Sequence, residues 1–148
     1  MESERKTVLV TGASRGIGSE IAARFAREGC RVVLNYHLHE REAKELAEKL
    51  EAGRPAIPGG WVLPVRADVS DFSQVREMFA LARERFGPVD VLVNNAGRNL
   101  DGPFLEMSDS DWQQVLDANL SGPFYLTKAF APAMLELEGG ASVVNVGA

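Results

Sequence analysis

The segment TGASRGIG, residues 11–18, combines closely spaced glycines with small polar side chains, which suits it to binding phosphate. Glycines let the backbone turn tightly and approach a pyrophosphate without a Cβ in the way. An apolar run at residues 6–10 comes before it, and Ile17, Ile21 and Phe25 follow at helical spacing, so the first amides of a helix would point at the anion. The order of strand, turn and helix therefore favours a nucleotide-phosphate site over an ordinary β-to-α turn, which the glycine spacing alone also allows.

Two further polar segments follow apolar runs later in the chain. Asp68 comes after the run at 61–65, and the sequence NNAG occupies residues 94–97 after the run at 89–93. In a parallel sheet the segments that follow the strands collect at one edge, where ligands bind. NNAG alone is also typical of a turn, and Asp68 alone could be a cap partner of Ser70. Together with TGASRGIG, they predict one site built from several strand ends.

The elements that would position these segments alternate regularly. Strands are predicted at residues 6–10, 32–34, 61–65, 89–93 and 142–146, each a continuous apolar run. Apolar residues at helical spacing predict helices after 18, around 43–50 and over 75–86, the last with Ser70 as its N-cap. One long helix is predicted from Ser108, in a capping box with Asp111, towards Leu137. The pattern predicts an α/β fold, a Rossmann-type doubly wound parallel sheet in the order 3-2-1-4-5.

Composition excludes several classes of protein. The chain has 148 residues, 45% of them hydrophobic and 25% charged, which fits one globular domain rather than a disordered chain. A net charge of −5 without a basic run argues against nucleic acid or an anionic membrane as partner. No apolar stretch is long enough for a signal peptide or membrane span, so a cytoplasmic protein is expected. The single cysteine, Cys30, and the pair His37 and His39 do not predict a metal site.

In combination the motifs resemble the classical short-chain dehydrogenase/reductase family, and most closely its 3-oxoacyl-acyl-carrier-protein reductase branch. TGASRGIG matches the family's cofactor motif, Ala67-Asp68-Val69 its adenine-contacting segment and NNAG its motif after the fourth strand. Asn119 matches the active-site asparagine of the family's long helix. The resemblance extends over essentially all 148 residues and implies hydride transfer between nicotinamide and a carbonyl or alcohol.

The resemblance also implies a role for each matching residue. Gly12, Gly16 and Gly18 would shape the phosphate turn, and Ser14 and the Ile17 amide would contact phosphate or ribose. Asp68 and the Val69 backbone would bind adenine, and Asn95, Ala96 and Gly97 would line the riboses. Asn94 would tie neighbouring strand ends together. Asn119 falls in phase with Trp112, Val115 and Leu116, so it is expected to be a buried amide that bonds backbone groups near Gly122-Pro123 and, by resemblance, supports a proton relay.

Charge at the end of the second strand indicates which cofactor is preferred. An NAD site usually places a carboxylate there, whereas NADP needs a cation nearby. Here that position reads Asn35-Tyr36-His37, and Arg15 lies in the glycine loop. NADP(H) is therefore the predicted cofactor, with NAD(H) as the alternative.

The sequence also departs from the family pattern. The family's Tyr-x-x-x-Lys pair is not formed by Tyr36 or Tyr125, and Ala148 stands where the family has a serine. Because such a domain needs about 250 residues, residues 1–148 are interpreted as one incomplete, cofactor-binding domain, inactive alone and acting on a small carbonyl or alcohol substrate in a full-length form. An exposed fifth strand carrying Val143, Val144 and Val146, and a bare helix face around Phe124 and Phe130, would then favour a homo-oligomer.

Two other functions fit the pattern less well. A non-catalytic NADP-binding module or scaffold would keep the binding motifs without turnover. A flavodoxin-like or receiver-type domain would share the strand order, but its acidic cluster is not apparent and TGASRGIG argues against it.

Overall fold

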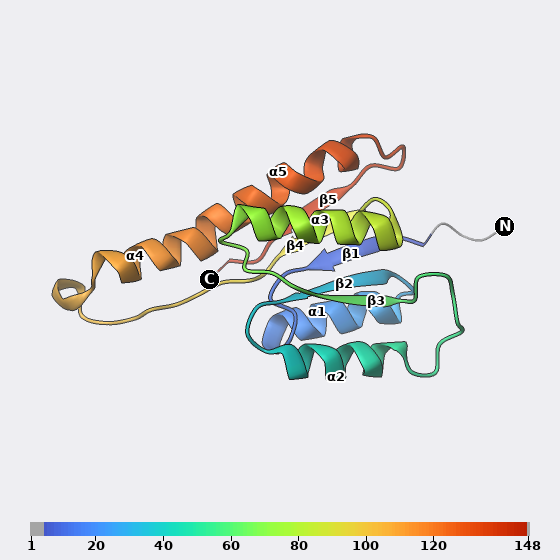
Figure 1. The fold of residues 1–148 in the computed structure, drawn as a ribbon, viewed down its shortest axis with the longest axis horizontal. Helices are drawn as coiled ribbons and strands as arrows, with labels where there is room; N and C mark the ends of the chain where they lie inside the picture. The colour runs from blue at the N-terminus through green and yellow to red at the C-terminus, as the bar shows by residue number, and fades with distance from the viewer. Residues whose placement is uncertain (1–4, 148) are drawn as a thin grey trace.

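The computed structural model describes residues 5–147 and contains one five-stranded parallel sheet in the order β3-β2-β1-β4-β5, which confirms the predicted fold (Figure 1). The predicted strand limits differ from the observed ones by one or two residues. The strands are β1 (Thr7–Val10), β2 (Arg31–Tyr36), β3 (Val62–Arg66), β4 (Val91–Asn94) and β5 (Ser142–Asn145). The α-helices are α1 (Gly16–Arg27), α2 (Glu40–Glu51), α3 (Phe72–Phe86), α4 (Asp109–Leu116) and α5 (Gly122–Leu135).

Helices cover both faces of the sheet, α1 and α2 on one face and α3 and α5 on the other (Figure 1). The core is accordingly divided in two. Alternate residues of β1 enter different halves: Val8 and Val10 pack on the side of α1 and α2, and Leu9 packs on the side of α3 and α5. Because both faces of the central strands are buried, their sequences are continuous apolar runs rather than alternating ones.

The strand register brings the polar segments to one edge. Val10 at the end of β1 pairs with Leu34 of β2 and with Val93 of β4. The segments that follow β1, β2, β3 and β4 therefore leave the sheet side by side, at its carboxyl edge. This is the edge at which the sequence places the phosphate and adenine motifs.

The predicted long helix is interrupted. Between α4 and α5 lies a π-helical turn, η2 (Asp117–Ser121), in which the Gly122 amide donates to the Asp117 carbonyl five residues back. Pro123 has no N–H, so it cannot make the α-helical bond to the Asn119 carbonyl, and the helix widens at this point instead. A π-turn inside a helix is frequently found at a functional site.

The apolar stripe predicted on this helix is wrong in its first part. Trp112 is 58% exposed and Asn119 is exposed, while Val115 and Leu116 are half-buried. The reason is visible in Figure 1, where α4 projects beyond the sheet, so its side chains have no core to pack against. Asn119 therefore bonds backbone groups as an exposed amide, not a buried one, and these groups belong to Arg98 rather than to residues near Gly122-Pro123.

The two predicted N-caps have different outcomes. Ser108 begins α4 in a capping box with Asp111, as predicted. Ser70 is not the cap of α3. The cap is Asp71, whose carboxylate accepts from the amides of Ser73 and Gln74, whereas the Ser70 hydroxyl donates to Asp68.

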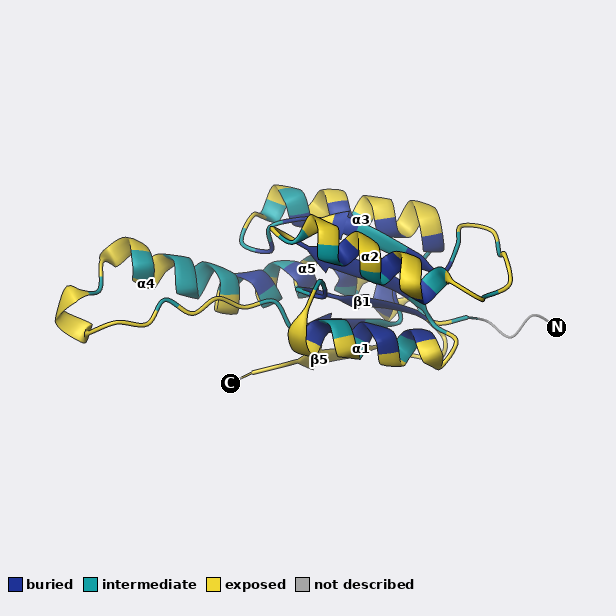
Figure 2. Ribbon diagram, turned by 90° about the horizontal axis from the view of Figure 1, so that it is seen from below, coloured by how far each residue is buried: buried dark blue, intermediate teal, exposed yellow. Residues whose placement is uncertain are grey.

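Strand β5 is exposed, as expected (Figure 2). Val143 and Val144 of this strand and Val146 just after it are all solvent-exposed. Phe124 is also exposed, at 59%. The expectation for Phe130 is wrong: it is 1% exposed and packs edge-to-face on Phe79 of α3, with ring centroids 5.1 Å apart. Helix α5 turns this ring towards α3, so only part of its apolar surface is bare.

Within residues 5–147 no helix is both long and apolar enough to cross a membrane.

Candidate functional site

A cavity of about 600 Å³ opens at the carboxyl edge of the sheet, between the segments that follow β1, β2, β3 and β4 and the end of α4. Most of the residues predicted to bind cofactor line it. They are Gly12, Ser14, Arg15, Gly16, Asn35, His37, Asp68, Val69, Asn95, Ala96 and Gly97. The fold thus gathers into one cavity residues that lie far apart in the chain.

Four predicted site residues do not line this cavity. Ile17 is exposed in a separate groove on the outer side of α1, and Gly18 is buried beneath the turn. Tyr36 is buried, with its hydroxyl donating to Glu40. Burial and this bond to Glu40 both raise the pKa of the Tyr36 phenol. Asn119 does not line the cavity itself but bonds the backbone of Arg98, which does.

The glycine loop has a shape that only glycine permits. Gly12 and Gly16 have φ values of +58° and +60°, in the left-handed region. A Cβ on Gly12 would lie 2.8 Å from the Ala96 Cα, and one on Gly18 would lie 2.3 Å from the Gly12 carbonyl oxygen. The first turn of α1 therefore lies directly against the loop, and bare backbone lines the cavity there.

Helix α1 begins without a capping side chain. Its N-cap, Arg15, makes no side-chain cap bond, and the first turn contains no acidic residue. By contrast, Asp71 caps α3 and Ser108 caps α4. The first amides of a helix carry a partial positive charge that favours an anion. The open end of α1 at the cavity wall is thus suited to a phosphate group.

Thr11 joins the glycine loop to the NNAG segment. Its buried hydroxyl accepts from the backbone amides of Asn95 and Ala96, both at 2.9 Å. In return, the side-chain amide of Asn95 donates through Nδ2 to the backbone carbonyls of Thr11 and Gly12, at 3.1 and 3.2 Å. These bonds hold the loops after β1 and β4 at a fixed separation.

Asn35 performs the corresponding task between β1, β2 and β3. Its carboxamide oxygen accepts from the Gly12 amide at 3.2 Å, and its nitrogen donates to the carbonyls of Val65 and Ala67. The side chain is almost wholly buried, so it positions the glycine loop. A neutral amide at this position also leaves the end of β2 without a carboxylate.

At the neighbouring strand end, the Asn94 amide donates to the Asn145 side chain at 2.9 Å. This bond links the ends of β4 and β5, the kind of tie expected of Asn94.

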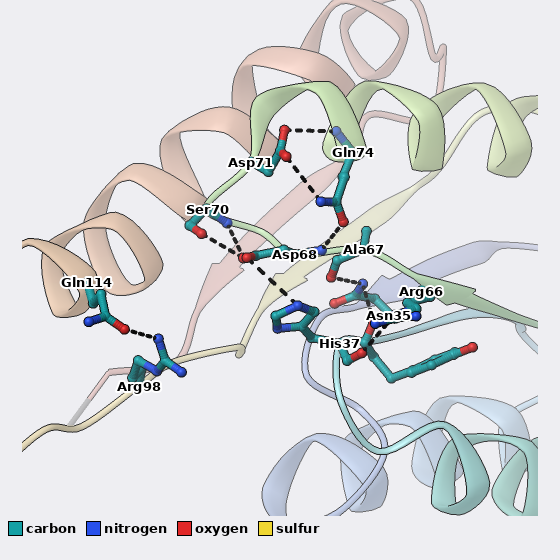
Figure 3. Close-up of polar contacts among 11 residues, drawn as sticks. Asn35, His37, Arg66, Ala67, Asp68, Ser70, Asp71, Gln74, Arg98 and Gln114 are labelled. Carbon is teal, nitrogen blue, oxygen red and sulfur yellow. Dashed lines mark hydrogen bonds and ion pairs between the residues drawn. The ribbon is translucent and has the colours of Figure 1, made fainter.

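Asp68 is an acidic residue of the cavity wall whose side chain has several partners. One carboxylate oxygen, Oδ1, accepts from the Ser70 amide at 2.9 Å and from its hydroxyl at 2.7 Å, while Oδ2 lies 3.8 Å from His37 Nε2 (Figure 3). Burial tends to raise the pKa of this carboxyl, but the two Ser70 bonds, with His37 and Arg98, outweigh it and hold the pKa below its usual value. Asp68 is therefore both a partner of Ser70 and a charged acceptor facing the cavity.

This lowered pKa predicts a pH dependence of stability. A carboxyl whose pKa is lower in the folded state stabilises the fold above its ordinary pKa, near 4, and that contribution is lost as the pH falls through the lowered value. We expect Asp68→Asn to flatten the fall in the free energy of unfolding below about pH 5, measured by urea denaturation at a series of pH values. Asp101→Asn, on an exposed loop, serves as the control. An unchanged acid limb in Asp68→Asn would refute the assignment.

Asn119 clamps the backbone next to NNAG. Its oxygen accepts from the Arg98 amide at 2.8 Å and its nitrogen donates to the Arg98 carbonyl at 2.9 Å. A Cβ on Gly97 would lie 2.9 Å from that same oxygen, so Gly97 leaves room for the clamp. Asn119 thus fixes the end of the cavity lining from the π-turn, and its catalytic role stays a prediction.

Several lining residues carry no motif that would have predicted them. Arg98 directly follows NNAG and donates to Gln114 of α4 at 2.6 Å, so its guanidinium stands at the cavity wall (Figure 3). A charged residue immediately after the motif was the available signal. The other unpredicted lining residues are Leu38, His39, Ser70, Asn99, Gln114, Asp117 and Ala118, while Ala67, which also lines the cavity, belongs to the predicted adenine-contacting segment.

Metal-ligating residues do not cluster in the part of the chain that the structure describes, where no group of three or more His, Cys, Asp or Glu side chains could hold an ion. Cys30 is half-buried, and burial together with Asp90 raises the pKa of its thiol. Ala148, at the family's serine position, lies outside the described residues.

Comparison of the sequence with known families and proteins identifies relatives. The family model described as short chain dehydrogenase matches residues 6–148. The 3-oxoacyl-[acyl-carrier-protein] reductase of Staphylococcus epidermidis is 38% identical over 141 residues, which are 95% of this chain and 55% of that reductase. Glucose 1-dehydrogenase 2 of Bacillus subtilis is 39% identical over 142 residues, or 95% of this chain and 53% of the dehydrogenase. The chain spans about half the length of the curated relatives it matches.

Solved structures give the same result. A blue fluorescent protein from a metagenomic library, solved in complex with NADPH, superimposes with a TM-score of 0.85 at 34% identity, over 97% of this chain and 56% of that one. A short-chain dehydrogenase/reductase from Brucella melitensis superimposes with a TM-score of 0.82 at 37% identity, over 98% of this chain and 56% of that one. The chain therefore belongs to the short-chain dehydrogenase/reductase family and corresponds to the amino-terminal portion of its members.

Proposed function

We propose that the cavity at the carboxyl edge binds NADP(H). The chain would be the cofactor-binding part of an oxidoreductase that transfers hydride between nicotinamide and a carbonyl or alcohol. One observation carries the proposal. The uncapped, acid-free start of α1 opens onto a cavity wall of bare glycine backbone, at the edge where Asp68 and the NNAG segment also lie. A dinucleotide has a pyrophosphate for the first feature and an adenosine for the second.

The described residues supply groups for the pyrophosphate, the adenine and the riboses of the cofactor. The loop from Gly12 to Gly18 and the α1 amides would hold the pyrophosphate, since side chains there would block its approach. The Asp68 carboxylate would accept from the adenine amino group, because its Oδ2 is not used by Ser70. The backbone of Asn95, Ala96 and Gly97 would line the riboses. When bound, the nicotinamide would give or accept the hydride.

The charges around the cavity favour NADP(H) over NAD(H). The end of β2 carries Asn35, Tyr36 and His37 and no carboxylate, while Arg15 lines the same cavity. A carboxylate at this position would bind a ribose hydroxyl and repel a 2′-phosphate. The NADPH bound by the metagenomic relative is consistent with this preference.

Catalysis requires more than the described residues supply. Asn119 could support a proton relay from the π-turn, but neither Tyr36 nor Tyr125 is followed by lysine at the fourth position. The resemblance places the tyrosine and lysine after β5. The second candidate is a non-catalytic NADP-binding module or scaffold, which would bind the cofactor without turnover. We expect the 148-residue chain to bind NADPH without oxidising it in the presence of a carbonyl compound.

Cofactor choice is tested by titrating the protein with NADPH and, separately, with NADH, with the heat of binding measured by calorimetry. We expect NADPH to bind at least about tenfold more tightly, the effect of one charge-assisted hydrogen bond. Arg15→Gln should remove most of this preference by weakening NADPH alone. Arg24→Gln, on the outer side of α1 in an ion pair with Glu28, is the matched control and should change neither affinity. Binding of neither nucleotide, or tighter binding of NADH, would contradict the proposal.

A further inference from the structure

Arg98 adds a charged side chain to the cavity wall, beside the segment that follows β3. Gly122, at the start of α5, packs so closely on Val69 of that segment that a Cβ on it would lie 3.0 Å from Val69 Cγ2. The π-turn and the end of α4 therefore lie next to this segment. Gln114 of α4 and Ala118 of the π-turn line the same cavity, and Arg98 Nη1 donates to the Gln114 side chain at 2.6 Å. The guanidinium thus lies at the end of the cavity where adenine is proposed to bind.

Both the backbone and the side chain of Arg98 are held in place. The Asn119 side chain bonds its backbone amide and carbonyl. Figure 3 shows the Arg98 side chain directed towards α4, where it meets Gln114, and the Gln114 amide in turn donates to the Ser110 hydroxyl at 3.2 Å. Because Arg98 is exposed and Gln114 engages only its Nη1, the flat face of the guanidinium remains available to a ligand.

The carboxylates of the cavity leave this guanidinium unpaired. Asp68 and Asp117 both line the cavity, and in the described part of the chain neither forms an ion pair with Arg98. Arg98 nevertheless acts on Asp68 through space. Burial tends to raise the pKa of Asp68, whereas the Ser70 bonds and, after them, the charges of His37 and Arg98 lower it. The guanidinium and the Asp68 carboxylate therefore border the same space without touching.

Resting on the proposed function, we propose that Arg98 is a cofactor-binding residue that stacks its guanidinium on the adenine ring, and that Gln114 is the positioning residue that sets its orientation. A guanidinium is flat and weakly hydrated, so it stacks on aromatic rings, whereas the ammonium of lysine is a compact, strongly hydrated charge. Asp68 would hold the amino edge of adenine, and Arg98 would cover one face of the ring. The NNAG motif ends at Gly97, so the family resemblance assigns no role to Arg98.

Arg98→Lys separates stacking from charge, with affinities measured by calorimetric titration. Lysine keeps the positive charge but loses the flat guanidinium, so we expect NADPH to bind about fivefold more weakly. Adenosine 2′,5′-bisphosphate, which carries only the adenine half of the cofactor, should lose affinity by the same factor. The Asn119 bonds use only the backbone of residue 98, so they persist in this variant. Arg24→Lys, on the outer side of α1, is the matched control and should bind both ligands as wild type does.

Two substitutions of Gln114 test the orientation of the guanidinium. Gln114→Leu removes the acceptor of the Arg98 bond, so it should weaken NADPH about threefold. Gln114→Glu keeps an acceptor at the same place and should restore the affinity of wild type. Contact with the ring is observed directly by NMR: the wild-type complex should show nuclear Overhauser effects between the Arg98 side chain and the ring protons of adenine.

The outcomes separate this inference from the proposed function. If Arg98→Lys bound NADPH as tightly as wild type, charge alone would account for the residue and stacking would be refuted. A loss of NADPH affinity that adenosine 2′,5′-bisphosphate does not share, or a wild-type complex without Overhauser effects between Arg98 and adenine, would also overturn the inference. In each of these cases NADPH still binds, so the proposed function stands. If wild type binds neither ligand, both proposals fail together.

Discussion

Gly18→Ala is expected to destabilise the fold by about 3 kcal/mol, at the upper end of the usual cost of overpacking. It is also expected to weaken NADPH binding at least about tenfold, because a distortion of the glycine loop that costs about 1.4 kcal/mol of binding free energy is enough for that loss. The added Cβ would lie 2.3 Å from the Gly12 carbonyl oxygen and 2.5 Å from Asn95 Nδ2. These two atoms are hydrogen-bonded to each other, so the methyl group must separate α1 from the loop after β4. The better helix propensity of alanine, about 1 kcal/mol, offsets only part of this cost.

Gly16→Ala is the matched control for this prediction. Gly16 lies two residues earlier, and a Cβ there meets no atom within 4 Å. Its φ of +60° still disfavours alanine, at a cost of about 1 kcal/mol. Urea denaturation and NADPH titration of both variants make the comparison. Equal stability of Gly18→Ala and Gly16→Ala would show that close packing at Gly18 does not determine the shape of the loop.

Thr11→Val is expected to cost about 3 kcal/mol of stability, because it leaves two backbone amides without an acceptor, each worth about 1–3 kcal/mol. Valine has almost the same shape, and Thr11 is only 2% exposed, so the loss would come from the hydroxyl and not from packing. The amides concerned are those of Asn95 and Ala96. Hydrogen exchange at both should accelerate, while amides in the centre of α2 should keep their relative protection.

Thr11→Ser separates the hydroxyl from the methyl group. Serine keeps the acceptor and loses one methyl, at a cost of about 1 kcal/mol. Exchange at Asn95 and Ala96 should then stay slow. If Thr11→Ser and Thr11→Val lost the same stability and the same protection, the hydroxyl would not be what joins the loops after β1 and β4.

The sheet could be predicted because its evidence is local. Each central strand is a continuous apolar run buried on both faces, as Val8, Leu9 and Val10 illustrate, and the alternation with helices leaves few topologies. Parallel topology then implies that TGASRGIG, Asp68 and NNAG meet at one edge. What could be inferred was therefore the neighbourhood of the site.

Side-chain positions on α4 and α5 could not be predicted in the same way. Helical spacing shows which residues share a face, but not what that face meets. Phe130 is buried because α3 presents Phe79 to it, and Trp112 is exposed because α4 extends past the sheet. Both outcomes depend on packing between distant segments.

The bonds that shape the cavity also lie beyond sequence reasoning. Asn119 bonds the backbone of Arg98, 21 residues away, and Thr11 bonds that of Asn95, 84 residues away. Backbone amides leave no trace in residue identities, so a motif indicates that Asn119 matters without indicating its partner. The approach of His37 to Asp68 has the same origin, since it depends on how two adjacent loops leave the sheet.

The proposed site for the phosphates of NADP(H) is the open start of α1 together with the glycine loop. The most direct measurement is an amide NMR spectrum of the protein recorded during titration with NADPH. We expect the largest shift changes at the amides of Gly12, Gly16, Ile17 and Gly18, with further changes at Asp68 and Gly97. Changes confined to the outer groove of α1, at Ile21, Arg24 and Phe25, or no changes at saturating NADPH, would contradict it.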